Sequence, residues 1–235
     1  MSIAEKLQTI AENEQKVFDA GVKSEHDRFW DAYQQSGKRT VYEYAFAGEV
    51  WDEKMFKPKY NMIPTGAYMM FRSCGLTGDL DEHLARAGVT LDFSRCLNAA
   101  YLFNLSKIET LGTIDLSKMQ GGYMNFFDST YLKTIRKFIP TPNIEIPASN
   151  FGTALENITV EGALSRSCNF QKCPLTVESM KSIISCLTNY VGTSKEGSYT
   201  LKFSDACWEA LETNGKAPNG DTWKDYVNYT LGWAI

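Results

Sequence analysis

The feature that most constrains the fold is a repeat in the middle of the chain. Phe103, Phe127 and Phe151 lie 24 residues apart twice in succession. A short apolar-x-x-apolar motif follows each of them, at Ile108–Leu111, Leu132–Ile135 and Leu155–Ile158. Phe71 precedes Phe103 by a wider interval, so the first repeat carries an insertion near positions 81–88. A period of roughly 20 to 50 residues is typical of chains built from stacked structural repeats.

A second set of segments keeps the same rhythm between these motifs. It comprises Leu91–Cys96, Ile114–Met119 and Asn169–Cys173, in which apolar residues alternate as in a strand. Asp92 and Asp115 occupy equivalent positions in this set, so we expect them to cap a turn rather than to bind a ligand.

A unit of about 24 residues cannot bury its own apolar face, so successive units must stack and share one core. We expect the phenylalanine and leucine positions to point inward, while Glu109, Lys133 and Glu156 face water. Each unit then supplies one short strand to a narrow sheet. The predicted fold class is α+β: a short solenoid of leucine-rich-type repeats over residues 61–173, with a helix before it and an α/β cap after it.

The part of the chain before the repeats is predicted to hold a helix and an aromatic-rich connector. Over residues 1–36, Ile3, Leu7, Ile10 and Val17 fall on a coiled-coil seam that Glu14 interrupts. This pattern fits either an amphipathic helix folded on its own domain or a short stalk for attachment or homo-oligomerisation. Residues 37–60 predict a cap strand and connector, whose aromatic side chains serve either as packing or as a ligand platform.

Residues 174–235 are predicted to form the α/β cap. Thr176 is a suitable N-cap, with Ser179 three positions along, for a helix that we expect to run to Gly192. The other predicted elements are a strand over Ser198–Phe203, a helix over Asp205–Glu212 with Trp208 and Leu211 inward, a helix over Thr222–Tyr229 and a terminal strand over Leu231–Ile235.

Composition restricts the partners and the location. A net charge of −4 and the absence of any run of five basic residues argue against nucleic acid as a partner. No stretch approaches 18 consecutive apolar residues, and the N-terminus lacks an apolar signal region, so we expect no membrane insertion and no signal peptide. The protein is therefore expected in a bacterial cytoplasm during synthesis. The six cysteines form no CxxC pair, so we expect them to be reduced and buried, without a zinc ion.

Residue types that carry chemistry are scarce. His26 and His83 are the two histidines, and neither stands in a nucleophile motif. Asp79 and Asp81 could act as an acid–base pair or bind calcium, but they lack the glycine and distal glutamate of an EF-hand loop. We therefore predict a protein that is not an enzyme, with no catalytic residue, cofactor or metal, and the sequence assigns no binding residue.

The repeats over residues 60–173 resemble the BspA-like leucine-rich repeats of bacterial surface proteins. The overall arrangement of the chain resembles that of small leucine-rich-repeat proteins of phages and prophages of gut Firmicutes. Three short segments carry this resemblance: the opening segment Ile3–Val17, the Phe29–Tyr33 block and the closing Gly232-Trp233 pair. The chain departs from the pattern in its long first repeat and at Asn150-Phe151, which lacks the tyrosine of the other repeats. The resemblance implies a binding role in a virion or tail, and implies no catalytic residue.

Two kinds of non-enzymatic function follow from these observations. The first is a phage tail or virion-associated adhesion protein that binds a receptor, with a protein or a cell-surface glycan as its partner. The second is a structural or decoration protein of a phage particle, or a protein-protein interaction module of a bacterium. In either case the N-terminal helix is expected to mediate homo-oligomerisation.

Overall fold

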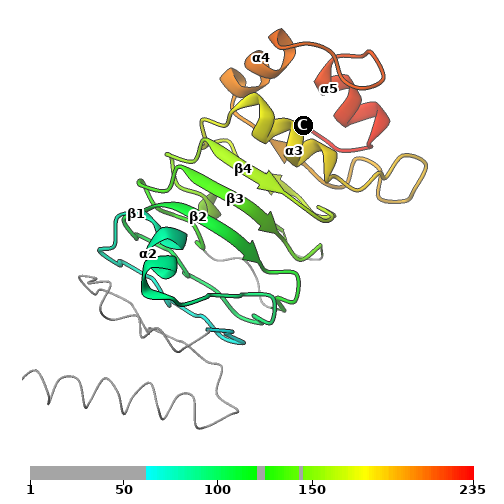
Figure 1. Cartoon of the computed structure of the whole chain (residues 1–235). Coiled ribbons are helices and arrows are strands. Elements are labelled where there is room, and N and C mark those ends of the chain that lie inside the picture. Colours follow the sequence, from blue (N-terminus) through cyan, green and yellow to red (C-terminus); the bar gives the residue numbers. More distant parts are fainter. Residues whose placement is uncertain (1–61, 121–124, 143–144) are drawn as a thin grey trace, which may run out of the picture. The chain divides into compact units, whose positions relative to one another are not determined.

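The computed structural model describes residues 62–120, 125–142 and 145–235. The predictions for the N-terminal helix, the aromatic connector and His26 lie outside these residues. The described part is α+β, with two parallel sheets and four α-helices (Figure 1). None of the helices within the described ranges is long and apolar enough to cross a membrane.

The main sheet has four parallel strands that lie side by side in chain order. They are β1 (Gly78–Asp79), β2 (Ile108–Asp115), β3 (Thr134–Ile139) and β4 (Asn157–Val160). The register pairs Thr110 with Thr134, and Thr134 with Asn157. The step from β2 to β3 thus equals the period of the sequence repeat, and the step from β3 to β4 nearly equals it. The register shifts once between β3 and β4, within Ile135 to Phe138.

Shorter elements complete the described part. They are α2 (Leu80–Ala87), the 3-10 turn Ala148–Asn150, β5 (Cys168–Asn169), α3 (Val177–Ser185), β6 (Leu201–Lys202), α4 (Asp205–Thr213), α5 (Trp223–Asp225) and the π-helical turn Tyr226–Thr230. Strands β5 and β6 form the second sheet. The predicted insertion in the first repeat is α2, which Asp79 caps at its start and Gly88 at its end.

A column of stacked phenylalanine rings forms the core beneath the sheet. Ring centroids are 5.2 Å apart between Phe71 and Phe103, 6.0 Å between Phe103 and Phe127, and 5.4 Å between Phe127 and Phe151. All four side chains are buried, as the sequence predicts. The sequence pattern places Phe170 with Phe93 and Leu116, but its ring stacks on Phe151 at 4.9 Å and continues this column. Phe170 follows Phe151 after a shorter step than those between the earlier rings, so the last unit is shorter than the others.

The backbone repeats its conformation just before the column. Met69, Tyr101 and Asn125 each lie two positions before a column phenylalanine, and each has a positive φ of 48–59°. A left-handed conformation costs a non-glycine residue about 1 kcal/mol or more, so its recurrence shows that the surrounding structure imposes it. Here the N–H of Phe71 donates to Leu102 O at 2.8 Å, and that of Phe103 to Phe126 O at 2.8 Å.

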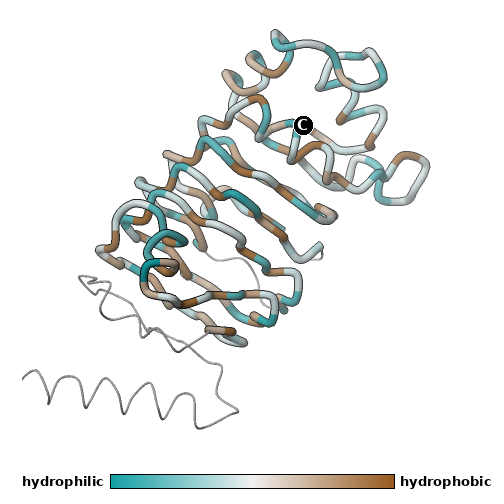
Figure 2. Tube along the Cα trace, in the orientation of Figure 1, coloured by the Kyte–Doolittle hydropathy of each residue, from teal (hydrophilic) through white to brown (hydrophobic). Residues whose placement is uncertain are grey.

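Polar turns close the units as predicted. Asp92 accepts a hydrogen bond from the backbone N–H of Ser94 at 2.8 Å, and Asp115 accepts one from Ser117 at 2.9 Å. Asn169 does the same for Gln171 at 3.0 Å. Figure 2 shows hydrophobic and hydrophilic residues alternating along the strands and turns. The prediction that Asp92 and Asp115 stabilise turns is confirmed.

The C-terminal part matches its prediction in the helices better than in the strands. Thr176 caps α3 by accepting from the Ser179 N–H at 3.4 Å. The helix ends at Ser185 rather than near Gly192, because Cys186 and Leu187 donate to carbonyls three positions back and close it with a tight turn. Helix α4 buries Trp208 and Leu211 as expected. The predicted strands over Ser198–Phe203 and Leu231–Ile235 are wrong in extent. Within the first, β6 covers two residues, and the second contributes a single bridge, from Ala234 to Thr200.

Candidate functional site

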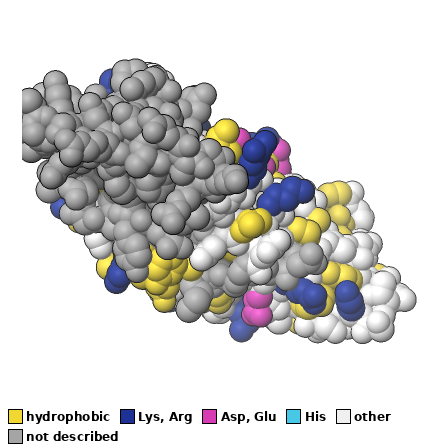
Figure 3. Space-filling model, turned by 90° about the horizontal axis from the view of Figure 1, so that it is seen from below, with side chains coloured by type: hydrophobic (Ala, Val, Ile, Leu, Met, Phe, Trp, Pro, Cys, Tyr) yellow, Lys and Arg dark blue, Asp and Glu magenta, His cyan; other side chains and the backbone are white. Residues whose placement is uncertain are grey.

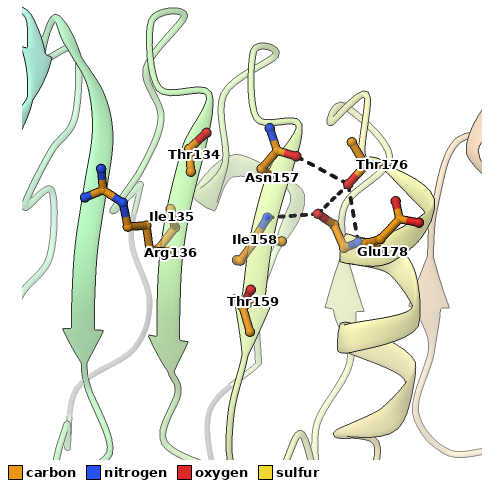
Figure 4. Close-up of a pocket in the computed structure, with 9 residues that line it drawn as sticks. Thr134, Ile135, Arg136, Asn157, Ile158, Thr159, Thr176 and Glu178 are labelled. Atoms are coloured by element: carbon orange, nitrogen blue, oxygen red, sulfur yellow. Dashed lines mark hydrogen bonds between the residues drawn. The ribbon is translucent and has the colours of Figure 1, made fainter.

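An open groove of about 330 Å³ lies on the solvent-facing side of the main sheet. It is bounded by β3, β4 and the first turn of α3 (Figure 4). Its polar lining comprises Thr134, Arg136, Asn157, Thr159, Thr176, Glu178 and Ser179. None of the described residues that line it is aromatic, and its floor is the backbone of the two strands with Ile135 and Ile158.

Strand alternation places these side chains. Ile135 and Ile158 are register partners, and both point into the core, with 0% and 3% of their surface exposed. Their neighbours along each strand must therefore point outward. Thr134 and Arg136 flank Ile135, while Asn157 and Thr159 flank Ile158, so four polar side chains from two strands lie on one face.

Helix α3 forms one wall of the groove by taking the place of a fifth strand. The Ser179 hydroxyl accepts a hydrogen bond from the Ile158 N–H at 2.9 Å and donates one to Glu156 O at 3.1 Å. One turn along, Ser182 accepts from the Val160 N–H at 2.8 Å. Two serines one helical turn apart thus satisfy the edge of β4, where another strand would otherwise pair.

The N-terminal end of α3, at the edge of this wall, is also hydrogen-bonded. The Thr176 hydroxyl lies 2.8 Å from the Ser179 hydroxyl and donates to the Asn157 side-chain oxygen at 3.5 Å (Figure 4). Within the described residues, the Asn157 side chain forms a hydrogen bond through this oxygen alone. Its NH₂ group is therefore available as a donor at the groove surface. Asn157 is exposed.

On the other side of the groove, Arg136 reaches away from β4 toward β2 (Figure 4). Its guanidinium forms one ion pair with Asp79 and a second one with Asp81 at 3.4 Å. The Asp81 carboxylate lies directly over Gly112, where an added Cβ would come within 1.6 Å of it. These four residues, which we term the Arg136 clasp, fasten α2 to the face of the sheet.

The clasp moves the pKa values of its two carboxyls in opposite directions. Burial raises the pKa of Asp79, but hydrogen bonds from Arg136 and the Asp81 N–H outweigh it, so the pKa lies below its usual value. Burial and the adjacent Asp79 carboxylate raise the pKa of Asp81 above its usual value. Arg136 is thus balanced mainly by Asp79, and Asp81 is the more readily protonated group.

Two further ion pairs lie along β3. Lys133, just before β3, pairs with Glu109 at 3.1 Å, and Lys137 pairs with Glu161 at 2.6 Å. Each basic side chain of this strand therefore has a carboxylate partner. Glu178, on the α3 wall, forms no ion pair with any described residue.

The other candidate residues are held in structural roles. His83 is partly exposed and hydrogen-bonds to Thr77 O at 2.8 Å and to Arg86 at 2.9 Å. The described ranges contain no group of three or more His, Cys, Asp or Glu side chains placed to hold a metal ion. The six cysteines are free, and burial raises the pKa of Cys96 to about 11 and of Cys173 to about 12. These two thiols stay protonated at neutral pH, which makes them poor nucleophiles.

Of the groove residues, the sequence pattern singles out Thr176 and Ser179 alone, as a helix cap and not as part of a site. The sequence indicates Asp79 and Asp81 as a pair, but gives no sign of their joint partner Arg136, which is distant from both in the chain. A usable signal was present in the repeat itself. Thr110, Thr134 and Asn157 align when the units are superimposed, and an outward polar row at the repeat period indicates an exposed face.

No protein-family model matches the sequence, and the searches of curated proteins and of solved structures found no match either. The functional argument therefore depends on the residues and their geometry.

Proposed function

We propose that this chain is a short leucine-rich-type solenoid and a non-enzymatic binding protein, with the groove on the sheet as its recognition surface. Three observations support the solenoid. The strands pair in chain order, their register steps follow the period of the sequence repeat, and phenylalanine rings stack from unit to unit. Solenoids of this type present their sheet as an extended binding face.

The lining of the groove favours a ligand rich in hydroxyl groups, and this observation carries the proposal. Interfaces with proteins are enriched in aromatic side chains, Met and Arg, and most of their binding energy comes from a few buried Trp, Tyr and Arg residues. The described lining has threonine, asparagine and glutamate instead, and its arginine is held by carboxylates. Hydroxyl and amide groups both donate and accept, which matches a carbohydrate.

Large exposed apolar side chains lie outside the groove. They include Leu97, Leu105 and Tyr131. On the face in Figure 3, hydrophobic side chains of the described residues are interspersed with Lys, Arg and other polar groups. A cell-surface glycan is therefore a better candidate for this groove than a protein. Together with the resemblance to phage and prophage proteins, this supports an adhesion protein of a phage tail or virion.

Two matched threonines provide the test. Thr159 lines the groove from β4, whereas Thr113 is also exposed but lies on β2 outside the groove. Replacing either with valine keeps the shape and the strand preference but removes one hydroxyl group. The full chain and both variants would be applied to a glycan array and to intact Firmicutes cells. Loss of about fivefold or more in binding for Thr159→Val, with Thr113→Val unchanged, is expected from one lost hydrogen bond.

Equal binding by the two variants would place recognition elsewhere on the molecule. Absence of binding to both glycans and cells, combined with retention on purified phage particles, would favour the structural or decoration role instead.

A further inference from the structure

The charges around the groove are unequal in number. Three basic side chains, Lys133, Arg136 and Lys137, lie on or next to β3, and all three are paired. Six carboxylates lie among or beside them, namely Glu109, Asp79, Asp81, Glu156, Glu161 and Glu178. Three positive and six negative groups give a formal charge of −3.

The excess negative charge lies at the groove itself. Among the described residues that line the groove, Arg136 is the one basic side chain, and two carboxylates hold its guanidinium on the side away from β4. Glu178 stands on the opposite wall without an ion pair to a described residue. A bound ligand would therefore lie between a neutralised cation and an unpaired carboxylate.

We propose that the groove selects uncharged carbohydrates and disfavours those carrying sulfate, phosphate or carboxylate groups, and that Asp81 and Glu178 set this selectivity. The inference depends on the proposed function, because it names the ligand class of the same groove. The neutral donors and acceptors that an uncharged glycan would use are Thr134, Asn157 and Thr159.

Simple electrostatics gives the size of the discrimination. Two like charges about 4 Å apart in water repel by about 1 kcal/mol, which corresponds to about a fivefold change in affinity. An anionic ligand would meet this repulsion from Glu178, and it could recruit Arg136 only by displacing Asp79 or Asp81 from the clasp. Salt weakens the effect, since exposed charges are screened over about 8–10 Å at physiological ionic strength.

The experiment compares glycans that share one core and differ only by an added sulfate or sialic acid, printed on one array at low salt. The wild-type full chain should bind the uncharged member at least about fivefold more tightly than its acidic derivative. In the double variant Asp81→Asn/Glu178→Gln, the affinity for the acidic derivative relative to that for the uncharged member should rise about fivefold or more. Glu209→Gln on α4, an exposed glutamate outside the groove, is the matched control and should change neither.

The outcomes separate the two proposals. Equal or tighter binding of acidic glycans by the wild type, abolished by Thr159→Val, would overturn the selectivity and keep the groove as the binding site. Acidic binding that the Asp81→Asn/Glu178→Gln variant leaves unchanged would also overturn it. Failure to bind any glycan, charged or uncharged, would overturn both proposals.

Circular dichroism and thermal unfolding of each variant show whether a loss of binding comes from misfolding. The Asp81→Asn change is mild in this respect, because a side-chain amide oxygen can still accept the hydrogen bond that the Asp81 carboxylate accepts from the Gly112 N–H.

Discussion

Replacing Ser179 with alanine tests why the main sheet ends at β4. The hydroxyl of this residue accepts from the Ile158 N–H at 2.9 Å and donates to Glu156 O at 3.1 Å. Alanine keeps the helix, since its helix propensity exceeds that of serine, but removes both bonds. The edge of β4 then has a buried backbone N–H without a partner, because α3 still covers it and keeps water out.

The expected magnitude follows from burial. Ser179 has 4% of its surface exposed, so water cannot replace the lost hydroxyl without moving the helix. An unsatisfied buried donor costs about 1–3 kcal/mol, and the gain in helix propensity offsets about half a kcal/mol of this at most. We expect Ser179→Ala to lower the free energy of unfolding by about 1–2.5 kcal/mol.

The same helix supplies a matched series. Ser182 makes an equivalent bond to the Val160 N–H at 2.8 Å but is only partly buried, so its replacement should cost less, about 1 kcal/mol. Ser185 lies another turn along, is exposed, and bonds only locally among the described residues, to Ser182 O at 2.7 Å and to the Cys186 thiol. Its replacement should change stability by less than about 0.5 kcal/mol.

Urea unfolding of the full chain, followed by circular dichroism, measures the three variants under identical conditions. The order Ser179→Ala, then Ser182→Ala, then Ser185→Ala, with unchanged m-values, is the expected result. Equal losses for the first and third variants would refute the edge-capping argument, because the two serines differ in their bonds to β4 and not in their helix. A Ser179→Cys variant, similar in size but a weaker hydrogen-bonding group, should fall between wild type and alanine.

Three further variants test the core, one close backbone contact and the clasp. Phe127→Ala should cost about 3–5 kcal/mol in urea unfolding, because the ring is 1% exposed and stacks on two others. Gly152→Ala should cost about 3 kcal/mol or more, since its Cβ would lie 1.8 Å from the backbone oxygen of Ser129. Arg136→Met should cost at most about 1 kcal/mol near pH 7, and less in acid. The pKa of Asp79 is depressed in the folded state, so its carboxylate stabilises the fold above its usual value of 3.8, and this contribution is lost as the pH falls through the lower folded-state pKa.

Each of these variants has an internal control. Tyr131→Ala removes a ring that is 48% exposed and should be nearly neutral beside Phe127→Ala. Gly112→Ala meets the end of the Asp81 side chain, which can rotate away, so it should cost less than Gly152→Ala. A loss of stability in Arg136→Met that is the same at pH 7 and pH 3 would show that the clasp acts through packing rather than charge.

The parts of the fold that follow from local pattern were predictable from the sequence. The spacing of the repeat predicts the column of phenylalanine rings, and the equivalent positions of Asp92 and Asp115 predict two of the turns. Both features depend on residues that recur at a fixed spacing. The sequence predicts the start of helix α3 correctly, because Thr176 and Ser179 form a recognisable cap. It does not predict the end of the helix, since Leu187 continues the helical spacing although a tight turn closes the helix before this residue.

The candidate site was not predictable in the same way. It depends on single contacts between segments that the sequence gives no reason to connect, such as Arg136 on β3 with Asp79 on β1. Whether a threonine lies in a groove or on an open face depends on what stands beside it. Thr113 and Thr159 are both exposed strand residues, and only the second lies in the groove between its strand and α3.

The groove exists because the sheet ends in a helix rather than in another strand. A fifth strand would lie about 4.8 Å from β4 and extend the same flat face, whereas a helix about 10 Å across rises above it and forms a wall. Ser179 and Ser182 therefore serve two purposes, since the bonds that satisfy the β4 edge also fix the height and position of that wall. Ser179→Ala should therefore weaken ligand binding as well as stability, even though the other polar side chains of the lining are all kept. A variant that loses stability and retains full binding, measured well below its unfolding temperature, would show that the wall is not part of the recognition surface.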